Sequence, residues 1–161
     1  MLTHLDQQGR AHMVDVSGKP TTLRVARARG VVVMQAATLG LVLQGQMPKG
    51  DVLAAMRIAG IMAAKKTWEL IPLCHPLQLK EARIEINTEA PGELEILAQV
   101  SAMDSTGVEM EALTAVTVAA LTAIDMCKAS DPRMVIKHIH LLDKTGGRSG
   151  DFHWEASESE G

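Results

Sequence analysis

The segment from Arg83 to Val100 constrains the fold most, because apolar and polar side chains alternate along it on both sides of a tight turn. Ile84 and Ile86 have polar neighbours, and beyond Pro91-Gly92 one face carries the side chains of Leu94, Ile96, Ala98 and Val100. This pattern predicts a β-hairpin with one face in water and one face buried. Helices from elsewhere in the chain are needed to cover the buried face.

Two segments are predicted to be the helices that provide this cover. Residues 51–66 begin at Asp51, a good N-cap residue, and end with Lys65 and Lys66, which complement the helix dipole. The small side chains between them permit close packing against another element. A longer helix is predicted over 108–129, where Thr106 and Glu109 have capping-box spacing. Its expected core stripe consists of Met110, Leu113, Thr117, Ala120, Ile124 and Cys127.

The remaining segments complete the order of elements. We expect strands at 11–16, 22–34 and 134–142, a short helix at 36–44, an irregular connection at 67–79 and a Gly-rich loop at 143–151. The order β–β–α–α–β–β–α–β predicts an α+β, ferredoxin-like sandwich, with a mainly antiparallel sheet and helices on one face. Residues 1–154 form one domain in this interpretation, and the acidic tail at 155–161 is expected to be disordered.

Composition excludes several classes of function. The 161 residues include only three aromatic side chains, Trp68, Phe152 and Trp154, whereas single-stranded nucleic acids are bound on aromatic stacking platforms. The formal net charge is −3, and no basic stripe indicates a nucleic-acid partner. We see no signal peptide and no apolar run of about 18 residues, so no membrane association is expected. The two cysteines make no disulfide framework and favour a cytoplasmic setting.

Two loops place reactive side chains beside irregular backbone. Lys49 lies just before the helix predicted at 51–66, so it is either a phosphate-binding lysine or an exposed loop lysine. In Leu73-Cys74-His75-Pro76, the proline biases His75 toward extended backbone. His75 is therefore either an acid–base or orienting group, or a histidine that is hydrogen-bonded in a half-buried loop. Zinc ligation by Cys74 and His75 is disfavoured, because no further ligand pair accompanies them.

The long predicted helix carries further candidate groups. Asp125 and Lys128 are three residues apart, so their head groups can meet, as an acid–base pair or as a surface ion pair. Glu111 lies 14 residues before Asp125, which places the two carboxyl groups about 21 Å apart along a straight helix. One small site in one chain cannot easily include both. If both act, either the ligand is long or two subunits contribute.

Two features near the end of the chain leave alternatives open. The segment Lys144–Gly150 places two cations beside backbone that three glycines free, so it is either a phosphate-binding nest or a mobile loop. It lacks the spacing of a Walker A loop. His138 and His140 alternate on the last predicted strand, where a solvated strand face is favoured over a metal-binding pair.

Several segments, in order, resemble the family of cyclic pyranopterin monophosphate synthase, the molybdenum-cofactor biosynthesis protein C. They are Ala11–Ser17, Lys49–Val52, Arg57–Ile61, Leu70–Leu77, Thr106–Thr114 and Asp125–Lys128. The similarity covers nearly the whole chain, from His4 to Phe152.

The resemblance implies a lyase of the second step of molybdenum-cofactor synthesis. This family converts 3′,8-cyclo-7,8-dihydroguanosine 5′-triphosphate into cyclic pyranopterin monophosphate and diphosphate, through a ring rearrangement and formation of a cyclic phosphate. The resemblance also implies a ferredoxin-like catalytic domain and a homohexamer of three dimers, with active sites at the dimer interface. The sequence itself gives no evidence of a required cofactor, and it leaves open a Mg²⁺ ion bound with the triphosphate.

Matched residue by residue, the resemblance assigns catalytic roles to Asp125, Lys128, Lys49 and His75. It assigns substrate contacts to Leu73, Cys74, His75, Met110 and Glu111, and contacts near the triphosphate to Arg24, Lys144 and Arg148. Arg148 stands where the family more often has lysine, so it keeps the charge but not the geometry. His138 and His140 match no motif of the family, which favours the solvated strand face.

Two other classes of protein stay open as alternatives. A non-catalytic nucleotide- or pterin-binding oligomeric module on the same fold would bind the triphosphate without turnover, because fold does not fix function. A metal-binding module would contain stoichiometric zinc. The intact set of Lys49, His75, Asp125 and Lys128 favours the enzyme.

Overall fold

The computed structural model describes residues 4–88 and 90–155. The elements follow the chain as β1 (Thr22–Val33), α1 (Ala36–Leu43), α2 (Val52–Lys65), α3 (Thr67–Leu70), β2 (Leu79–Asn87), β3 (Glu93–Asp104), α4 (Glu109–Cys127), β4 (Val135–Thr145) and β5 (Phe152–His153). Neighbouring strands are antiparallel, in the order β2-β3-β1-β4-β5. The first four strands have the ferredoxin-like order, which confirms the predicted fold class.

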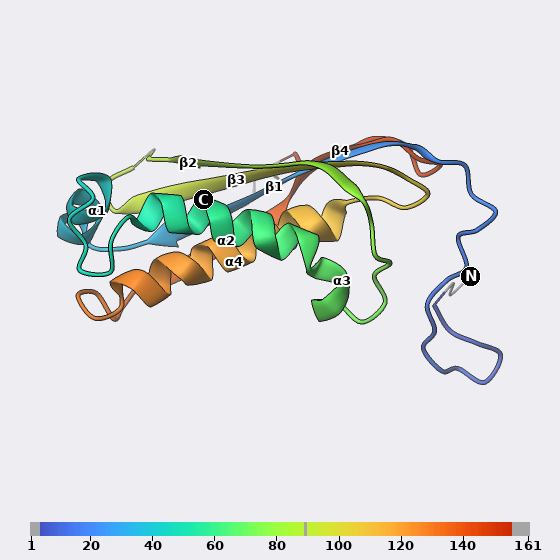
Figure 1. Cartoon of the computed structure of the whole chain (residues 1–161), viewed down its shortest axis with the longest axis horizontal. Helices are drawn as coiled ribbons and strands as arrows, with labels where there is room; N and C mark the ends of the chain where they lie inside the picture. The colour runs from blue at the N-terminus through green and yellow to red at the C-terminus, as the bar shows by residue number, and fades with distance from the viewer. Residues whose placement is uncertain (1–3, 89, 156–161) are drawn as a thin grey trace.

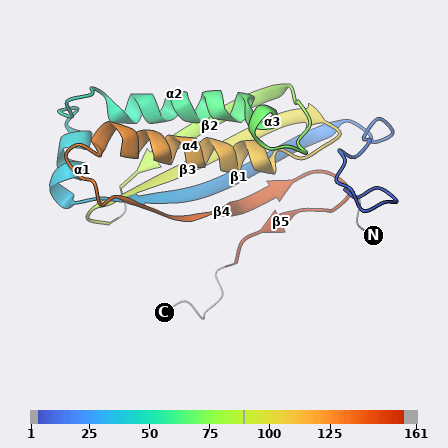
Figure 2. The ribbon, with the colours of Figure 1, turned by 90° about the horizontal axis from the view of Figure 1, so that it is seen from below.

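The sheet and the helices form two layers (Figure 1). α2 and α4 run side by side across one face of the sheet, while β4 and β5 lie at the sheet edge beyond α4 (Figure 2). The predicted hairpin is confirmed as β2 and β3, whose register pairs Ile86 with Ile96. Its apolar face lies under the helices, so that Ile84, Leu94 and Ile96 are buried. The opposite face carries exposed ion pairs such as Arg83–Glu85.

Small side chains let α4 approach the sheet closely. Ala112, Ala115 and Ala119 are fully buried along its inner face. Gly30 of β1 lies beneath Val116, and a Cβ atom at Gly30 would stand only 2.5 Å from Val116 Cγ1. By length and composition alone α4 could cross a membrane, yet in this fold it is a core helix that packs against the sheet and against its neighbour α2.

Three sequence predictions about helix ends and faces have different outcomes. Asp51 caps α2 as predicted, because its side chain accepts a hydrogen bond from the Ala54 N–H at 2.9 Å. The capping box at Thr106 is wrong, since Val108 is the N-cap of α4 and no side-chain cap bond forms. The core stripe is wrong in part. The face of α4 that packs against the sheet and α2 is made largely of alanines. Met110 is exposed, and the side chains that are only half-buried are Leu113, Thr117 and Ile124.

The strand predicted at 11–16 does not join the sheet. Both sides of β1 are occupied by β3 and β4, and the described N-terminal segment makes only an isolated bridge between Leu5 and Ala11. The short α3 and β5 were not predicted, and β4 continues to Thr145, so the Gly-rich loop begins later than expected. The predicted acidic tail, apart from Glu155, lies outside the described residues.

Candidate active site

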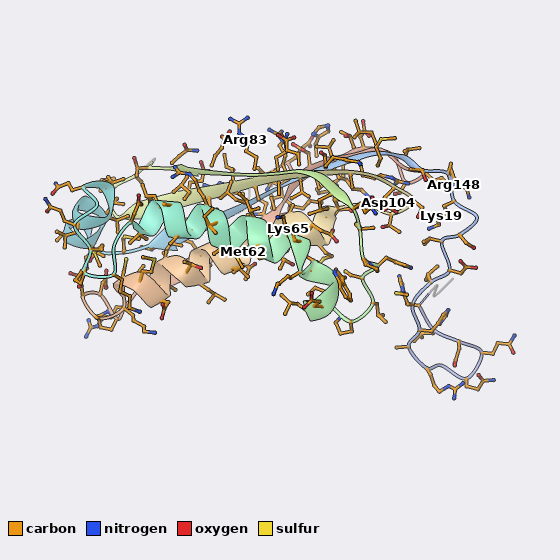
Figure 3. The ribbon with its side chains drawn as sticks, in the orientation of Figure 1. Lys19, Met62, Lys65, Arg83, Asp104 and Arg148 are labelled. Atoms are coloured by element: carbon orange, nitrogen blue, oxygen red, sulfur yellow. The ribbon has the colours of Figure 1, made fainter. Side chains whose placement is uncertain are left out.

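Two adjoining cavities open near the N-terminal end of α4. The cationic cavity, of about 490 Å³, has a charged lining of Lys19, Arg24, Glu109, Lys144 and Arg148. The apolar cavity, of about 400 Å³, is lined by residues that include Val14, Val16, Leu73, Cys74, His75, Met110 and Glu111. Lys19, Thr106, Gly107 and Glu109 line both cavities, so the two cavities are adjacent. Lys19, Asp104 and Arg148 gather at this end of the molecule (Figure 3).

Arg24 ties together the two loops that shape the cationic cavity. Its Nε and Nη2 atoms donate hydrogen bonds to the carbonyl oxygens of Asp104 and Ser105, at 3.2 and 3.1 Å. Gly147 of the Gly-rich loop lies against the same guanidinium. A Cβ atom on Gly147 would stand 1.8 Å from Arg24 Nη1, and its φ of +91° favours glycine. Because Gly147 has no side chain, the Arg24 guanidinium has room to lie at the cavity wall.

Lys144 faces the same cavity from the end of β4. Its Nζ lies 3.0 Å from Glu109 Oε1 and donates a hydrogen bond to the Ser149 hydroxyl at 3.3 Å. Because this ion pair is partly exposed, an entering anion can replace the Glu109 carboxylate beside Lys144. In the described lining, the cations Lys19, Arg24, Lys144 and Arg148 outnumber the one carboxylate. This excess of positive charge suits a polyphosphate.

Glu111 is the buried acid of the apolar cavity. The residue is 4% exposed. Burial raises the pKa of its carboxyl group from 4.5 to about 7, and the charges of Glu109 and Asp104 add to the effect. Burial, and then the charge of Glu111, raises the pKa of the Cys74 thiol, which keeps that thiol neutral. A carboxyl group that titrates near neutral pH can both accept and release a proton.

His75 lies in the irregular segment between α3 and β2, where Pro76 follows it. The side chain is half-buried, and its Nε2 atom lies 2.8 Å from the carbonyl oxygen of Val14. Leu73, Cys74 and Met110 supply apolar wall around it in the same cavity. His75 and Glu111 thus line the same cavity, which adjoins the cationic one.

A separate cluster lies at the C-terminal end of α4. Lys128 Nζ donates to Asp125 Oδ1 at 2.6 Å, and Lys49 Nζ donates to Asp125 Oδ2 at 3.1 Å. The hydrogen bonds from Lys128 and then Lys49 hold the pKa of the Asp125 carboxyl group below its usual value. The side chains are 48–59% exposed. Lys49 joins the pair that the helical spacing predicts, and the carboxylate is ionised.

The structure divides the predicted site residues into two groups. Arg24, Lys144 and Arg148 meet the residues of the apolar cavity at one end of α4, whereas Lys49, Asp125 and Lys128 meet at the other. Glu111 and Asp125 lie on one continuous helix, about 21 Å apart at 1.5 Å per residue. One chain therefore carries two half-sites at opposite ends of the same helix.

Sequence analysis missed Lys19 and Glu109 as residues shared by both cavities. Lys19 follows a turn at Ser17-Gly18, and the preceding segment alternates, with Val14 and Val16 half-buried. That alternation indicates that one face of the segment packs against the protein. The same pattern is typical of a sheet strand, which is the structure predicted for residues 11–16. No signal in the sequence shows that Glu109 pairs with Lys144 across the fold.

Of the two histidines of β4, His138 is exposed and His140 is half-buried. His138 adopts a φ of +56° where the register of β4 shifts against β1, and His140 packs on Trp154 with ring centroids 4.6 Å apart. Within residues 4–88 and 90–155, no group of three or more His, Cys, Asp or Glu side chains is placed to hold a metal ion.

These features define a ferredoxin-like α+β protein in which a cationic cavity adjoins an apolar cavity with titratable groups. That layout is typical of an enzyme for a small phosphorylated molecule. The family model of the MoaC family matches residues 13–147. The chain belongs to the MoaC family.

Curated relatives cover nearly the whole chain. It is 60% identical to the cyclic pyranopterin monophosphate synthase of Chloroflexus aggregans, over 98% of this chain and 95% of the relative. It is 58% identical to the protein of that name from Desulfitobacterium hafniense, over 94% of this chain and 93% of the relative. It is also 56% identical to cyclic pyranopterin monophosphate synthase 1 of Mycobacterium bovis, over 98% and 92% of the two chains.

Proposed function

We propose that this protein is a cyclic pyranopterin monophosphate synthase, a lyase of molybdenum-cofactor biosynthesis. It converts 3′,8-cyclo-7,8-dihydroguanosine 5′-triphosphate into cyclic pyranopterin monophosphate and diphosphate. The observation that carries the proposal is that the cationic and the apolar cavity lie next to each other and share Lys19 and Glu109 in their linings. A triphosphate fits the cationic side, and the purine-derived rings fit the apolar side beside His75 and Glu111.

The working site combines two chains. In one chain, the cluster of Lys49, Asp125 and Lys128 lies about 21 Å from Glu111, too far to serve the same small substrate. A twofold partner supplies the missing half, because an isologous interface places the cluster of each chain against the cavities of the other. We propose a homohexamer of three dimers, with the active sites at the dimer interface.

Some of these residues bind the triphosphate, and others transfer protons. Arg24, Lys144 and Arg148 hold the triphosphate and stabilise the departing diphosphate, together with Lys19. Asp125 and Lys128 move protons during ring opening and reclosure, and His75 and Lys49 assist them. The low pKa of Asp125 makes it a weak base while both lysines donate to it. Substrate phosphates that draw those lysines away restore its basicity.

The walls that meet the rings are Leu73, Cys74 and Met110, none of them aromatic. No cofactor is required in this proposal, and a Mg²⁺ ion bound with the triphosphate stays a prediction. A cytoplasmic setting also stays a prediction, supported by the free thiols of Cys74 and Cys127.

The test is incubation of the purified protein with the cyclic guanosine triphosphate intermediate, followed by assay of diphosphate and of a pterin product. Asp125→Asn and Lys128→Ala should each lower single-turnover product formation at least 100-fold while assembly is kept. Lys65→Ala is the matched control, because Lys65 is the last residue of α2 (Figure 3) and lines neither cavity. Near-normal turnover in both site variants would remove their assigned roles, and tight binding without turnover in the wild type would favour the non-catalytic module.

A further inference from the structure

The segment before β1 belongs to the apolar cavity, although it does not join the sheet. Val14 and Val16 are half-buried in the cavity lining, while Met13, Asp15 and Ser17 between and around them are exposed. In Figure 1 this segment is the blue trace that passes the end of the sheet. A hydrogen bond joins it to the loop between α3 and β2, where His75 Nε2 lies 2.8 Å from the carbonyl oxygen of Val14.

This hydrogen bond fixes the chemistry of the histidine ring. A backbone carbonyl oxygen can only accept a hydrogen bond, so the ring atom 2.8 Å from Val14 O, which is Nε2, must carry the hydrogen. In a neutral imidazole the other nitrogen, Nδ1, then holds the free lone pair. Among the described residues Nδ1 has no hydrogen-bond partner, and the ring lies in the cavity lining.

We propose that the Val14 carbonyl is a positioning group, which holds His75 as the Nε2–H tautomer, and that His75 exchanges a proton with the substrate through Nδ1. The inference rests on the proposed function and deepens it. A proton that leaves the substrate passes to the Nδ1 lone pair and gives an imidazolium with both nitrogens protonated. The Nε2–H bond to Val14 then becomes charge-assisted and strengthens as the positive charge forms.

The segment also carries a carboxylate beside Val14. Asp15 follows Val14 directly, and its Oδ1 accepts a hydrogen bond from the Ser17 N–H at 2.9 Å. This bond, with the charge of His75 as a smaller cause, lowers the pKa of Asp15. This carboxylate is therefore held in place next to the Val14 carbonyl.

The first test reads the tautomer directly and needs no turnover. In ¹⁵N spectra of the full chain labelled at histidine, the His75 signals are assigned by their loss in His75→Gln. The expected result is an unprotonated Nδ1 and a protonated Nε2 in neutral His75. A dominant Nδ1–H tautomer, or a mixture like that of a free histidine, overturns the inference.

The second test weakens the acceptor without changing a side chain. Replacing Asp15 by its α-hydroxy acid turns the peptide bond after Val14 into an ester, whose carbonyl oxygen is a poorer acceptor. The Nε2–H population should fall and kcat should drop about fivefold, the worth of one ordinary hydrogen bond, with KM unchanged. The matched control places the ester one bond earlier, with the hydroxy acid at position 14, where the Val14 carbonyl remains an amide. Unchanged tautomer populations in the first ester overturn the inference.

His75→Gln separates catalysis from structure. The glutamine amide can still donate to the Val14 carbonyl but cannot accept a proton, so kcat should fall at least 100-fold with KM within about threefold. Normal turnover in His75→Gln overturns the use of Nδ1. If the predicted tautomer is present but the wild-type protein does not turn over the triphosphate, the proposed function fails with the catalytic use of Nδ1, whereas a wrong tautomer in an active enzyme removes only this inference.

Discussion

Replacing Glu111 by glutamine should make the stability of this protein depend differently on pH. The wild-type carboxyl group has a pKa of 4.5 in the unfolded chain and about 7 in the folded one. The folded state therefore holds the proton more tightly than the unfolded state between these values. Wild-type stability falls as pH rises through this window and levels off above the folded pKa, because both states are then ionised.

The magnitude follows from the two pKa values. At 1.36 kcal/mol per pH unit, the buried carboxylate costs the folded protein about 1 kcal/mol at pH 5 and about 3 kcal/mol at pH 8. Glutamine does not titrate, so any cost of burying its amide is the same at every pH. The free energy of unfolding of Glu111→Gln minus that of the wild type should rise by about 2.5 kcal/mol from pH 5 to pH 8.

Denaturant unfolding at fixed protein concentration measures this difference, since assembly also contributes to stability. In thermal melts the same change corresponds to about 5–10 °C in Tm. Glu69→Gln is the control, because Glu69 is exposed on α3 and should follow the wild type at every pH. A difference for Glu111→Gln that stays constant across this range would refute the assigned burial of the carboxyl group.

Three further predictions test other parts of the structure. Mixing His75→Gln and Asp125→Asn subunits by refolding should restore about a quarter of wild-type turnover. Half of the dimers are then mixed, and each mixed dimer has one intact site out of two. If no turnover returns, the whole site lies in one chain. Gly147→Ala should raise the KM for the triphosphate at least tenfold, since its Cβ displaces Arg24. Gly150→Ala, with a similar positive φ but open space, should leave KM unchanged in the same steady-state assay. Asp51→Ala should cost about 1 kcal/mol of unfolding free energy in urea titrations, because the Ala54 N–H loses its cap.

The sequence predicts the parts of this fold that depend on local patterns. Strict alternation fixes the β2–β3 hairpin, and an aspartate before an apolar run fixes the start of α2. The buried face of α4 follows a different rule, because closely spaced layers select small side chains. Ala112 and Ala119 are therefore more deeply buried than Met110 and Leu113, although hydrophobicity alone would place the larger side chains in the core. The distance between the helix and the sheet decides which side chains are buried, and the sequence of one helix does not give that distance.

The candidate site shows the same division. The spacing of Asp125 and Lys128 predicts their contact, which the structure confirms at 2.6 Å. Lys49 joins them from 76 residues away, and Glu109 reaches Lys144 across the sheet. Contacts of this kind depend on the order of strands and helices, so a single sequence gives no local signal for them. The same holds for Val14, whose alternating segment suggests a strand until β3 and β4 are seen to occupy both sides of β1.

The two half-sites carry carboxyl groups whose pKa values are shifted in opposite directions. Burial moves the pKa of Glu111 up to about 7, while Lys128 and Lys49 move that of Asp125 down. Within one chain these carboxyl groups never meet, since α4 separates them. In the proposed dimer they face one substrate from two chains, as a group that still holds a proton and a group that has lost it. Pairs of carboxyl groups separated in this way serve as acid and base at one pH, so assembly creates the pair as well as completing the pocket.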